Sequence, residues 1–203
     1  MTITYTNPIS GDQLAALTEE DAKIMGQIVY DVRIQTHDPR SVAYQKTHLQ
    51  SYINQCLHHF NIPDIFLIQA YDGDKCVAFR FIKPVKYSTL GSLQTEEEIS
   101  KYGRYRQWYI DQGLDFNTGL ASGFFGVHKD YNGQGIATKL RNLCNEEAKR
   151  KGYDWVLVQD IDSKSRWEWT MNYYKKNGYE VVMSDLRVPQ IFGGYGKFCY
   201  YKI

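Results

Sequence analysis

The 203-residue sequence lacks the features that would place it at once in a disulfide-rich, metal-binding, membrane or nucleic-acid-binding class. Its four cysteines stand singly, without a Cys-x-x-Cys pair or a Cys/His metal spacing, so we expect buried thiols and no metal site. No stretch approaches the roughly 20 apolar residues of a membrane span, and the opening MTITYTNPIS lacks the pattern of a signal peptide. The net charge of +1 excludes a strongly basic nucleic-acid binder. We therefore expect a cytoplasmic protein with neither membrane nor nucleic-acid partners.

The charges that are present are unevenly distributed along the chain. Residues 1–119 carry 11 Lys and Arg against 14 Asp and Glu, whereas residues 120–203 carry 13 against 9. The basic half also contains the glycine-rich stretch discussed below. This distribution favours a polyanionic small ligand in that half.

Capping residues mark the helix starts. Thr18-Glu-Glu-Asp21, Thr95-Glu-Glu-Glu98 and Ser165-Arg-Trp-Glu168 have the form of capping boxes, and Asp38-Pro39 puts proline at a first helical position. The predicted helices span 18–35, 38–60, 96–112 and 165–177, and a further helix follows Gly135.

The predicted strands span 3–6, 65–71, 76–83, 122–128, 154–159, 179–183 and 197–203. Asp72-Gly73-Asp74-Lys75 predicts an antiparallel hairpin, and the last two strands are expected to pair antiparallel as well. The order predicts a mixed α/β (α+β) fold, with one domain over 1–203 and a helical insertion at about 84–121.

The stretch Asn132-Gly-Gln-Gly-Ile-Ala137, between a strand and an amphipathic helix, predicts a backbone site for phosphate. A triphosphate-binding loop is excluded because no Gly-Lys-Ser/Thr follows. A dinucleotide-binding crossover would place glycines directly at the strand end, with a third glycine where Thr138 stands. It stays a minor alternative, with Asp160 at the spacing of a ribose-binding acid. A coenzyme A pyrophosphate site is the third reading.

Two motifs together resemble the GNAT superfamily of acyl-CoA-dependent N-acetyltransferases. The first is the strand that ends at Val127, followed by polar residues and by Asn132-Gly-Gln-Gly-Ile-Ala137, with Asn where the family usually has Arg or Gln. The second is Tyr173-Tyr-Lys-Lys-Asn-Gly-Tyr179, which matches the family's downstream Tyr and Gly-Phe pattern. The resemblance covers about residues 120–183. It implies a mostly antiparallel central sheet of about seven strands, flanked by helices, with splayed parallel strands at its centre.

The resemblance also implies a site for acetyl-CoA as the acyl donor. The pantetheine arm would lie along Phe125, Gly126 and Val127, and a backbone N–H near Val127 would stabilise the oxyanion. The pyrophosphate would be held by Asn132, Gly133, Gln134, Gly135, Ile136, Ala137 and Thr138, where small residues leave the backbone N–H groups accessible. Because Asn132 supplies no charge, the cations Lys129, Lys139 and Arg141 are candidates to assist.

Candidate catalytic residues follow from the same resemblance. Tyr174 occupies the family position of the general acid that protonates the leaving thiolate, although its helical spacing also suits core packing. Asp160, at the exit of a strand, is the candidate to remove the proton from the amine.

Substrate identity should depend on residues outside the cofactor motif. Tyr105 and Trp108 on the insertion helix, and Phe192 and Tyr195 in the loop before the last strand, are candidates to line a pocket for an aromatic or cationic amine. The insertion could instead cover the sheet or contact a second subunit, so a homodimer stays open.

We expect an N-acetyltransferase that moves an acetyl group from acetyl-CoA to a primary amine of a small molecule by direct attack. Two alternatives stay open: a protein or peptide N-acetyltransferase, and a non-catalytic coenzyme A-binding module.

Overall fold

The computed structural model describes residues 2–36, 49–88, 90–160, 164–189 and 195–203. Within them, eight strands form one mixed, mostly antiparallel sheet with the order β1-β3-β4-β5-β6-β8-β7, and β2 pairs with β3. The strands are β1 (Ile3–Tyr5), β2 (Ile9–Ser10), β3 (Phe66–Asp72), β4 (Lys75–Pro84), β5 (Gly119–Val127), β6 (Trp155–Asp160), β7 (Val181–Pro189) and β8 (Tyr195–Lys202). The predicted mixed fold is confirmed, with the short strand β2 as an addition to the predicted set.

The chain divides into two compact units, which are described separately. The first unit contains residues 1–83 and 123–147, and the second contains residues 84–122 and 148–203. The predicted helical insertion at 84–121 therefore belongs to the second unit. The prediction of a single domain over 1–203 stays a prediction.

The first unit is built on the predicted hairpin of β3 and β4. Its antiparallel register runs from Phe66 opposite Ile82 to Asp72 opposite Lys75, with an irregularity after Ala70. Gly73 makes the turn with a φ of 58°, a left-handed conformation that glycine adopts without steric cost. The hairpin prediction is confirmed.

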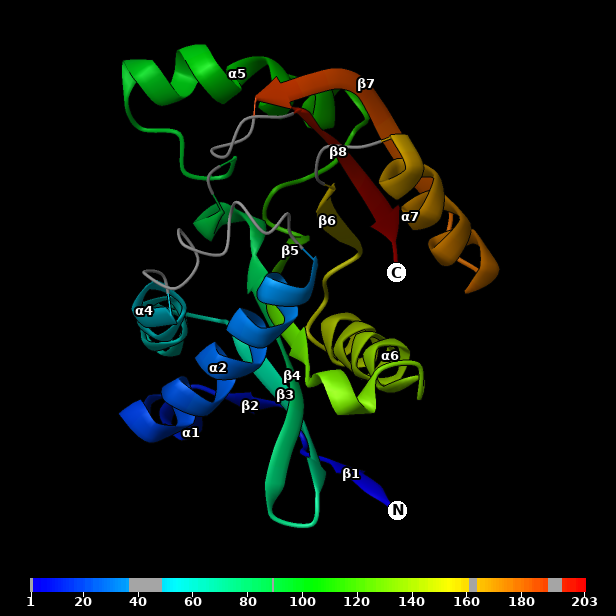
Figure 1. Ribbon diagram of the computed structural model, residues 1–203. Helices are drawn as coiled ribbons and strands as arrows, with labels where there is room; N and C mark the ends of the chain where they lie inside the picture. The colour runs from blue at the N-terminus through cyan, green and yellow to red at the C-terminus, as the bar shows by residue number, and fades with distance from the viewer. Residues whose placement is uncertain (1, 37–48, 89, 161–163, 190–194) are drawn as a thin grey trace. The chain divides into compact units, whose positions relative to one another are not determined.

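Helices cover both faces of this hairpin (Figure 1). The helices α1 (Asp12–Ala15), α2 (Glu19–Thr36) and α4 (Leu49–Phe60) pack with Phe79 and Phe81 of β4 in one apolar core. The helix α6 (Ile136–Arg150), up to Glu147, covers the other face. The predicted helix over 38–60 is described only from Leu49 onward, and its end at Phe60 is confirmed.

Two details explain how α2 and α6 are placed. The backbone N–H of Thr18 donates to Asp21 at 2.8 Å and the N–H of Asp21 donates to the Thr18 hydroxyl at 3.3 Å, which confirms the predicted box. On α6, Ile136, Leu140 and Cys144 are buried, as the sequence period requires.

The second unit contains the helices α5 (Glu96–Asp111) and α7 (Lys164–Lys176) and the strands β6, β7 and β8. The Thr95 and Glu98 side chains form the predicted capping box of α5. The strands β5 and β6 are parallel, with Gly119 opposite Trp155 and Ala121 opposite Leu157. The strand β8 pairs antiparallel with both β6 and β7, which confirms the predicted C-terminal pair.

Several boundaries in the second unit differ from the prediction; β5 begins at Gly119, three residues before the predicted Ser122, and β8 begins at Tyr195, two residues before the predicted Lys197. The strand β7 continues to Pro189, six residues beyond the predicted end at Met183, because it pairs with β8 as far as Tyr195. Proline is tolerated there because it lies at the end of an edge strand. The helix α7 begins at Lys164, one residue before the predicted capping Ser165.

Candidate functional site

The glycine turn of the first unit connects the end of β5 to α6. A short 3₁₀ turn, η2 (Lys129–Tyr131), follows the strand, and Gly133 and Gly135 come next with φ angles of 77° and 76°. Both angles lie in the left-handed region, so the turn requires glycine for its own backbone conformation. A Cβ atom added at either position would meet no atom within 4 Å. The space above both glycines is therefore open to a ligand.

The backbone of this turn offers hydrogen-bond donors at the start of a helix. Residues 132–135 are exposed, whereas the Ile136 side chain is only 2% exposed and anchors the first turn of α6 in the core. The N–H of Lys139 donates to the Gly135 carbonyl at 3.0 Å, so the N–H groups of 136–138 precede the regular helical bonds. Such a helix start attracts an anion through its backbone N–H donors and its dipole.

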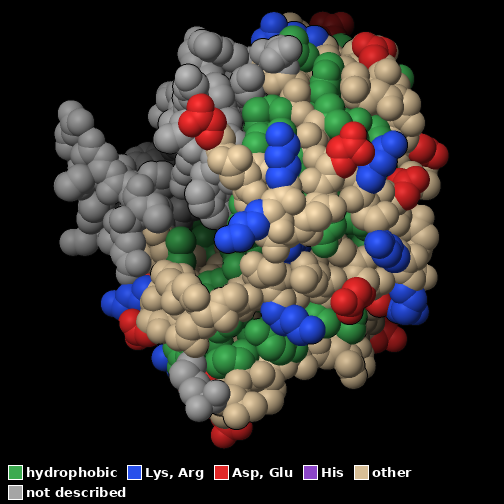
Figure 2. Space-filling model, turned by 90° about the vertical axis from the view of Figure 1, so that its right-hand side faces the viewer, with side chains coloured by type: hydrophobic (Ala, Val, Ile, Leu, Met, Phe, Trp, Pro, Cys, Tyr) green, Lys and Arg blue, Asp and Glu red, His purple; other side chains and the backbone are tan. Residues whose placement is uncertain are grey.

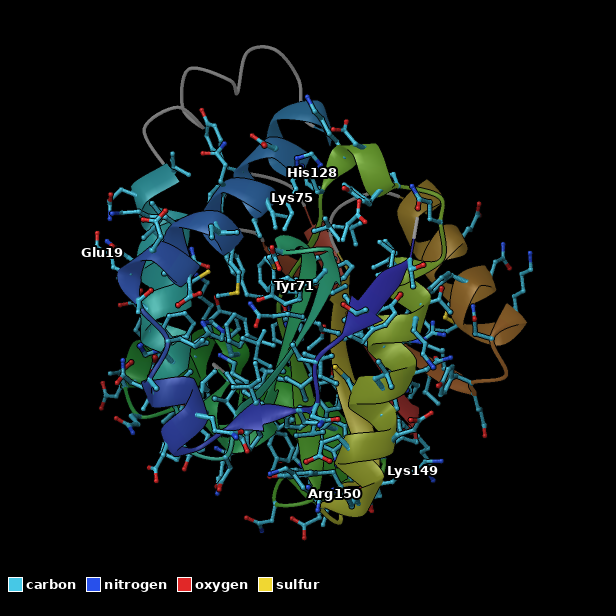
Figure 3. The ribbon with its side chains drawn as sticks, turned by 90° about the horizontal axis from the view of Figure 1, so that it is seen from below. Glu19, Tyr71, Lys75, His128, Lys149 and Arg150 are labelled. Carbon is cyan, nitrogen blue, oxygen red and sulfur yellow. The ribbon has the colours of Figure 1, made fainter. Side chains whose placement is uncertain are left out.

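The tip of the β3–β4 hairpin contacts the residues that precede this turn. The hydroxyl of Tyr131 donates to the Asp72 carboxylate at 2.9 Å, and this bond raises the pKa of Tyr131. The Lys75 ammonium lies 5.6 Å from the centre of the Tyr131 ring, and the His128 ring lies 5.7 Å from it. Figure 3 shows Lys75 and His128 near one another at this end of the hairpin. Sequence reasoning missed Asp72, Lys75 and Tyr131, because nothing local links a hairpin tip to a turn 59 positions later.

The three cations near the turn differ in exposure. Lys129 and Lys139 are exposed, as a phosphate-binding role requires. Arg141 is 1% exposed and donates to the Asn142 side chain at 3.0 Å, so its guanidinium is part of the interior. Asn132 is exposed at the start of the turn, where its side chain can donate to a ligand.

The end of β5 presents two different faces. The Phe125 ring is exposed and lies 5.5 Å from the Arg80 guanidinium. Gly126 faces α2 so closely that an added Cβ would lie 2.9 Å from Ile28. The N–H of His128 donates to the Val77 carbonyl of β4 at 2.8 Å. Because neighbouring residues of a strand direct their N–H groups to opposite sides, the N–H of Val127 points away from β4.

The predicted catalytic residues belong to the second unit. Tyr174 on α7 is 7% exposed, and its ring centre lies 4.7 Å from Tyr201 and 6.2 Å from Tyr179. Its ring is therefore packed, as its helical spacing allowed, and its role as an acid stays a prediction. Asp160 is the last residue of β6, and its backbone pairs with Lys197. The Asp160 side chain lies outside the described part of the structure.

Of the four predicted substrate residues, two have side chains packed in the core of the second unit, and the side chains of the other two are not described. Tyr105 is 1% exposed in the core of the second unit, and Trp108 packs on the same core, with its ring 4.8 Å from Tyr109. These two rings stabilise the second unit. Tyr195 begins β8 opposite Pro189, but its side chain is not described, and Phe192 lies outside the described residues.

The described residues contain no group of three or more His, Cys, Asp or Glu that could hold a metal ion. None of their helices is long and apolar enough to cross a membrane. Figure 2 shows Lys and Arg side chains interspersed with Asp and Glu on the face it displays.

A mixed α/β fold with an open, glycine-lined helix start after a strand is typical of proteins that bind a phosphate-bearing ligand. Comparison with known families and structures narrows this class. Residues 92–181 match the family model described as an acetyltransferase (GNAT) domain. A search of curated proteins gave no match.

Solved structures agree in fold. The chain is similar to the PaiA N-acetyltransferase from Thermoplasma acidophilum in complex with coenzyme A, with 13% identity, 100% coverage of both chains and a TM-score of 0.59. It is similar to an aminoglycoside 6'-N-acetyltransferase complexed with coenzyme A, with 14% identity, 100% and 96% coverage and a TM-score of 0.55. It is also similar to yncA from Salmonella typhimurium, solved with acetyl-CoA, with 13% identity, 100% and 94% coverage and a TM-score of 0.53. At these identities the likeness concerns the fold alone. Together with the family match over residues 92–181, it confirms the resemblance to GNAT acetyltransferases.

Proposed function

We propose that this protein transfers an acetyl group from acetyl-CoA to a primary amine of a small molecule. The observation that carries the proposal is the open turn at Gly133 and Gly135, where two left-handed glycines leave space above the first turn of α6. Structural neighbours that were solved with coenzyme A or acetyl-CoA support the choice of cofactor.

The residues of the turn fit the pyrophosphate of coenzyme A. The N–H groups from Gly133 to Thr138 can donate to its oxygens, and the Asn132 amide can add a neutral donor. The exposed Lys129 and Lys139 can supply the charge that Asn132 lacks. The buried Arg141 is left out of this set.

The reaction that we propose is a direct attack of the amine on the thioester carbonyl. The N–H of Val127, which points away from β4, can donate to the oxyanion that forms. Tyr174 is proposed to give its phenolic proton to the thiolate that leaves. These groups belong to different units of the chain, and the proposal assigns each a role without a distance between them.

The decisive experiment is a screen of small amines and peptides with acetyl-CoA, in which the release of free thiol is measured. The wild-type protein should release thiol with at least one small primary amine, and the Gly135→Trp variant should not bind coenzyme A in calorimetry. Acetylation confined to peptides would overturn the small-molecule assignment. Binding of coenzyme A without thiol release from any acceptor would overturn the enzymatic one.

Gly113→Ala is a useful companion to Gly135→Trp. Gly113 also has a left-handed φ, of 74°, and open space around its Cβ position, but it lies in the loop after α5. This variant should bind coenzyme A as the wild type does. Equal binding by Gly135→Trp would show that the turn does not hold the cofactor.

A further inference from the structure

Phe125 is an exposed apolar side chain on a strand that has neighbours on both sides. Among the described residues, four large apolar side chains are exposed, and three of them lie on the helices α2 and α5. Phe125 is the fourth and lies on β5, where its side chain is 36% exposed. Its backbone belongs to the segment proposed to bind the pantetheine arm of coenzyme A. An exposed ring at this place offers apolar surface that a ligand can cover.

The ring of Phe125 lies against a buried cation from the neighbouring strand. The Arg80 guanidinium is 5.5 Å from the centre of the Phe125 ring, and Arg80 is 6% exposed. A guanidinium within about 6 Å of a ring centre is attracted by the electrons of the ring face, and this attraction is stronger where water is excluded. A buried group therefore holds an exposed ring.

The position of Arg80 in β4 explains why its charge lies beside this ring. Phe79 and Phe81, on either side of it, belong to the core formed with α2 and α4. Successive side chains of a strand alternate between faces, so Arg80 points to the face that α6 covers. Its charge acts on that helix: burial raises the pKa of Cys144 to about 12, Arg80 lowers it, and Glu147 raises it. The guanidinium is thus enclosed between β4 and α6.

The backbone beside the ring is also packed from inside the first unit. An added Cβ at Gly126 would lie 2.9 Å from Ile28 of α2, on the opposite face of the strand from Arg80. Arginine suits the other face because its planar group stacks on a ring and keeps its charge throughout the pH range in which proteins are folded. The ring and its backbone are therefore both fixed by buried neighbours.

We propose that Arg80 is a positioning residue for coenzyme A, because its guanidinium fixes the Phe125 ring as the surface on which the pantetheine arm packs. This proposal rests on the proposed function, which assigns the arm to the same segment. The arm carries a dimethyl-substituted carbon and several methylene groups, and this apolar surface suits a phenyl ring. The nucleotide part of coenzyme A has its own donors at the glycine turn. Changes at Arg80 and Phe125 should therefore weaken binding of the arm and leave binding of the nucleotide unaffected.

The test compares two ligands by calorimetry: coenzyme A and 3'-phospho-ADP, which retains the nucleotide and its diphosphate but lacks the arm. Phe125→Ser removes the exposed ring and should raise the Kd of coenzyme A about tenfold or more. Arg80→Met should raise it about 3- to 30-fold, and Arg80→Lys, which keeps the charge, should lie between wild type and Arg80→Met. All three variants should bind 3'-phospho-ADP within about twofold of wild type. If Arg80→Met does not fold, Arg80→Lys and the Phe125 variants provide the same test.

Arg106→Met is the matched control for Arg80→Met. The Arg106 guanidinium lies 5.4 Å from the centre of the Phe116 ring, and both residues belong to the second unit. The control removes the same kind of contact in a part of the chain with no proposed cofactor contact. It should bind both ligands within about twofold of wild type.

A double variant tests whether Arg80 acts through the ring. Phe125→Leu keeps an apolar side chain without a ring face, so adding Arg80→Met to it should change the Kd of coenzyme A by less than about twofold. A further rise as large as that of Arg80→Met alone would overturn the positioning role.

The two ligands also separate this role from a role in folding and from the proposed function. Equal weakening of coenzyme A and 3'-phospho-ADP by Arg80→Met would assign Arg80 to the fold alone, and wild-type affinity for coenzyme A in Phe125→Ser would remove the ring from the site. A wild-type protein that binds no coenzyme A would refute the cofactor site itself. Binding with the expected differences but without acetylation of any amine would refute the proposed enzyme and support the role of Arg80.

Discussion

A methyl group at Gly135 should separate the energetics of the fold from the energetics of cofactor binding. Alanine at a φ of 76° must adopt the left-handed region, which costs about 1–2 kcal/mol of unfolding free energy. No further steric cost is expected in the folded chain, because the added Cβ would meet no atom within 4 Å. Gly135→Ala should therefore fold, with a modest loss of stability in urea unfolding.

The effect on coenzyme A should be larger, because the methyl group enters the space assigned to the phosphate. Loss of one hydrogen bond from a backbone N–H to a charged oxygen is about 1.5–3 kcal/mol. This corresponds to a rise in Kd of about 10- to 150-fold. Isothermal titration calorimetry with coenzyme A measures this directly.

Gly152→Ala is the matched control for this change. Gly152 follows the other end of α6 with a φ of 84°, and its Cβ position is equally open. It should lose similar stability, about 1–2 kcal/mol, with an unchanged Kd for coenzyme A. If Gly135→Ala also binds coenzyme A with the wild-type Kd, the turn does not hold phosphate and the proposed cofactor site is refuted.

Three further changes address the second unit. Tyr174→Phe should keep its ring contact with the core, so kcat should fall by about 100-fold while the free energy of unfolding changes by no more than about 1.5 kcal/mol; unchanged turnover would remove Tyr174 from the mechanism. Gly119→Ala places a Cβ 2.3 Å from the Trp155 indole and should lower stability by about 1–3 kcal/mol, as measured by urea unfolding. Backbone hydrogen bonds lower the pKa of Glu98, so its stabilising effect should be present above its unfolded pKa and be lost as pH falls through the lower folded value. Melting curves of wild type and Glu98→Gln between pH 6 and pH 3 should therefore converge at the acidic end; a constant difference would contradict the assignment.

Local chemistry accounts for most of what the sequence predicted. The boxes at Thr18 and Thr95, the Asp72–Lys75 turn and the glycines before α6 each act within a few residues, so their structure can be read from the chain itself. The same holds for the family motifs, which are contiguous. The prediction of a cofactor-binding loop followed from these short stretches.

Features that depend on distant neighbours could not be predicted. Pro189 reads as a strand breaker until β8 is known to pair with it. From the sequence, Tyr105 was predicted to line a substrate pocket. In the structure its side chain lies in the core of the second unit and is 1% exposed.

The bond from Tyr131 to Asp72 has a consequence for the kinetics of ligand exchange. The bond fixes the η2 residues that lead into the glycine turn when the chain folds. Little conformational entropy of these residues then remains to be lost when a ligand binds. Without this bond, the loss of freedom would fall on the binding step, and bound coenzyme A would leave sooner. We therefore expect a hairpin tip that carries no reacting group to prolong the residence of coenzyme A in the proposed site.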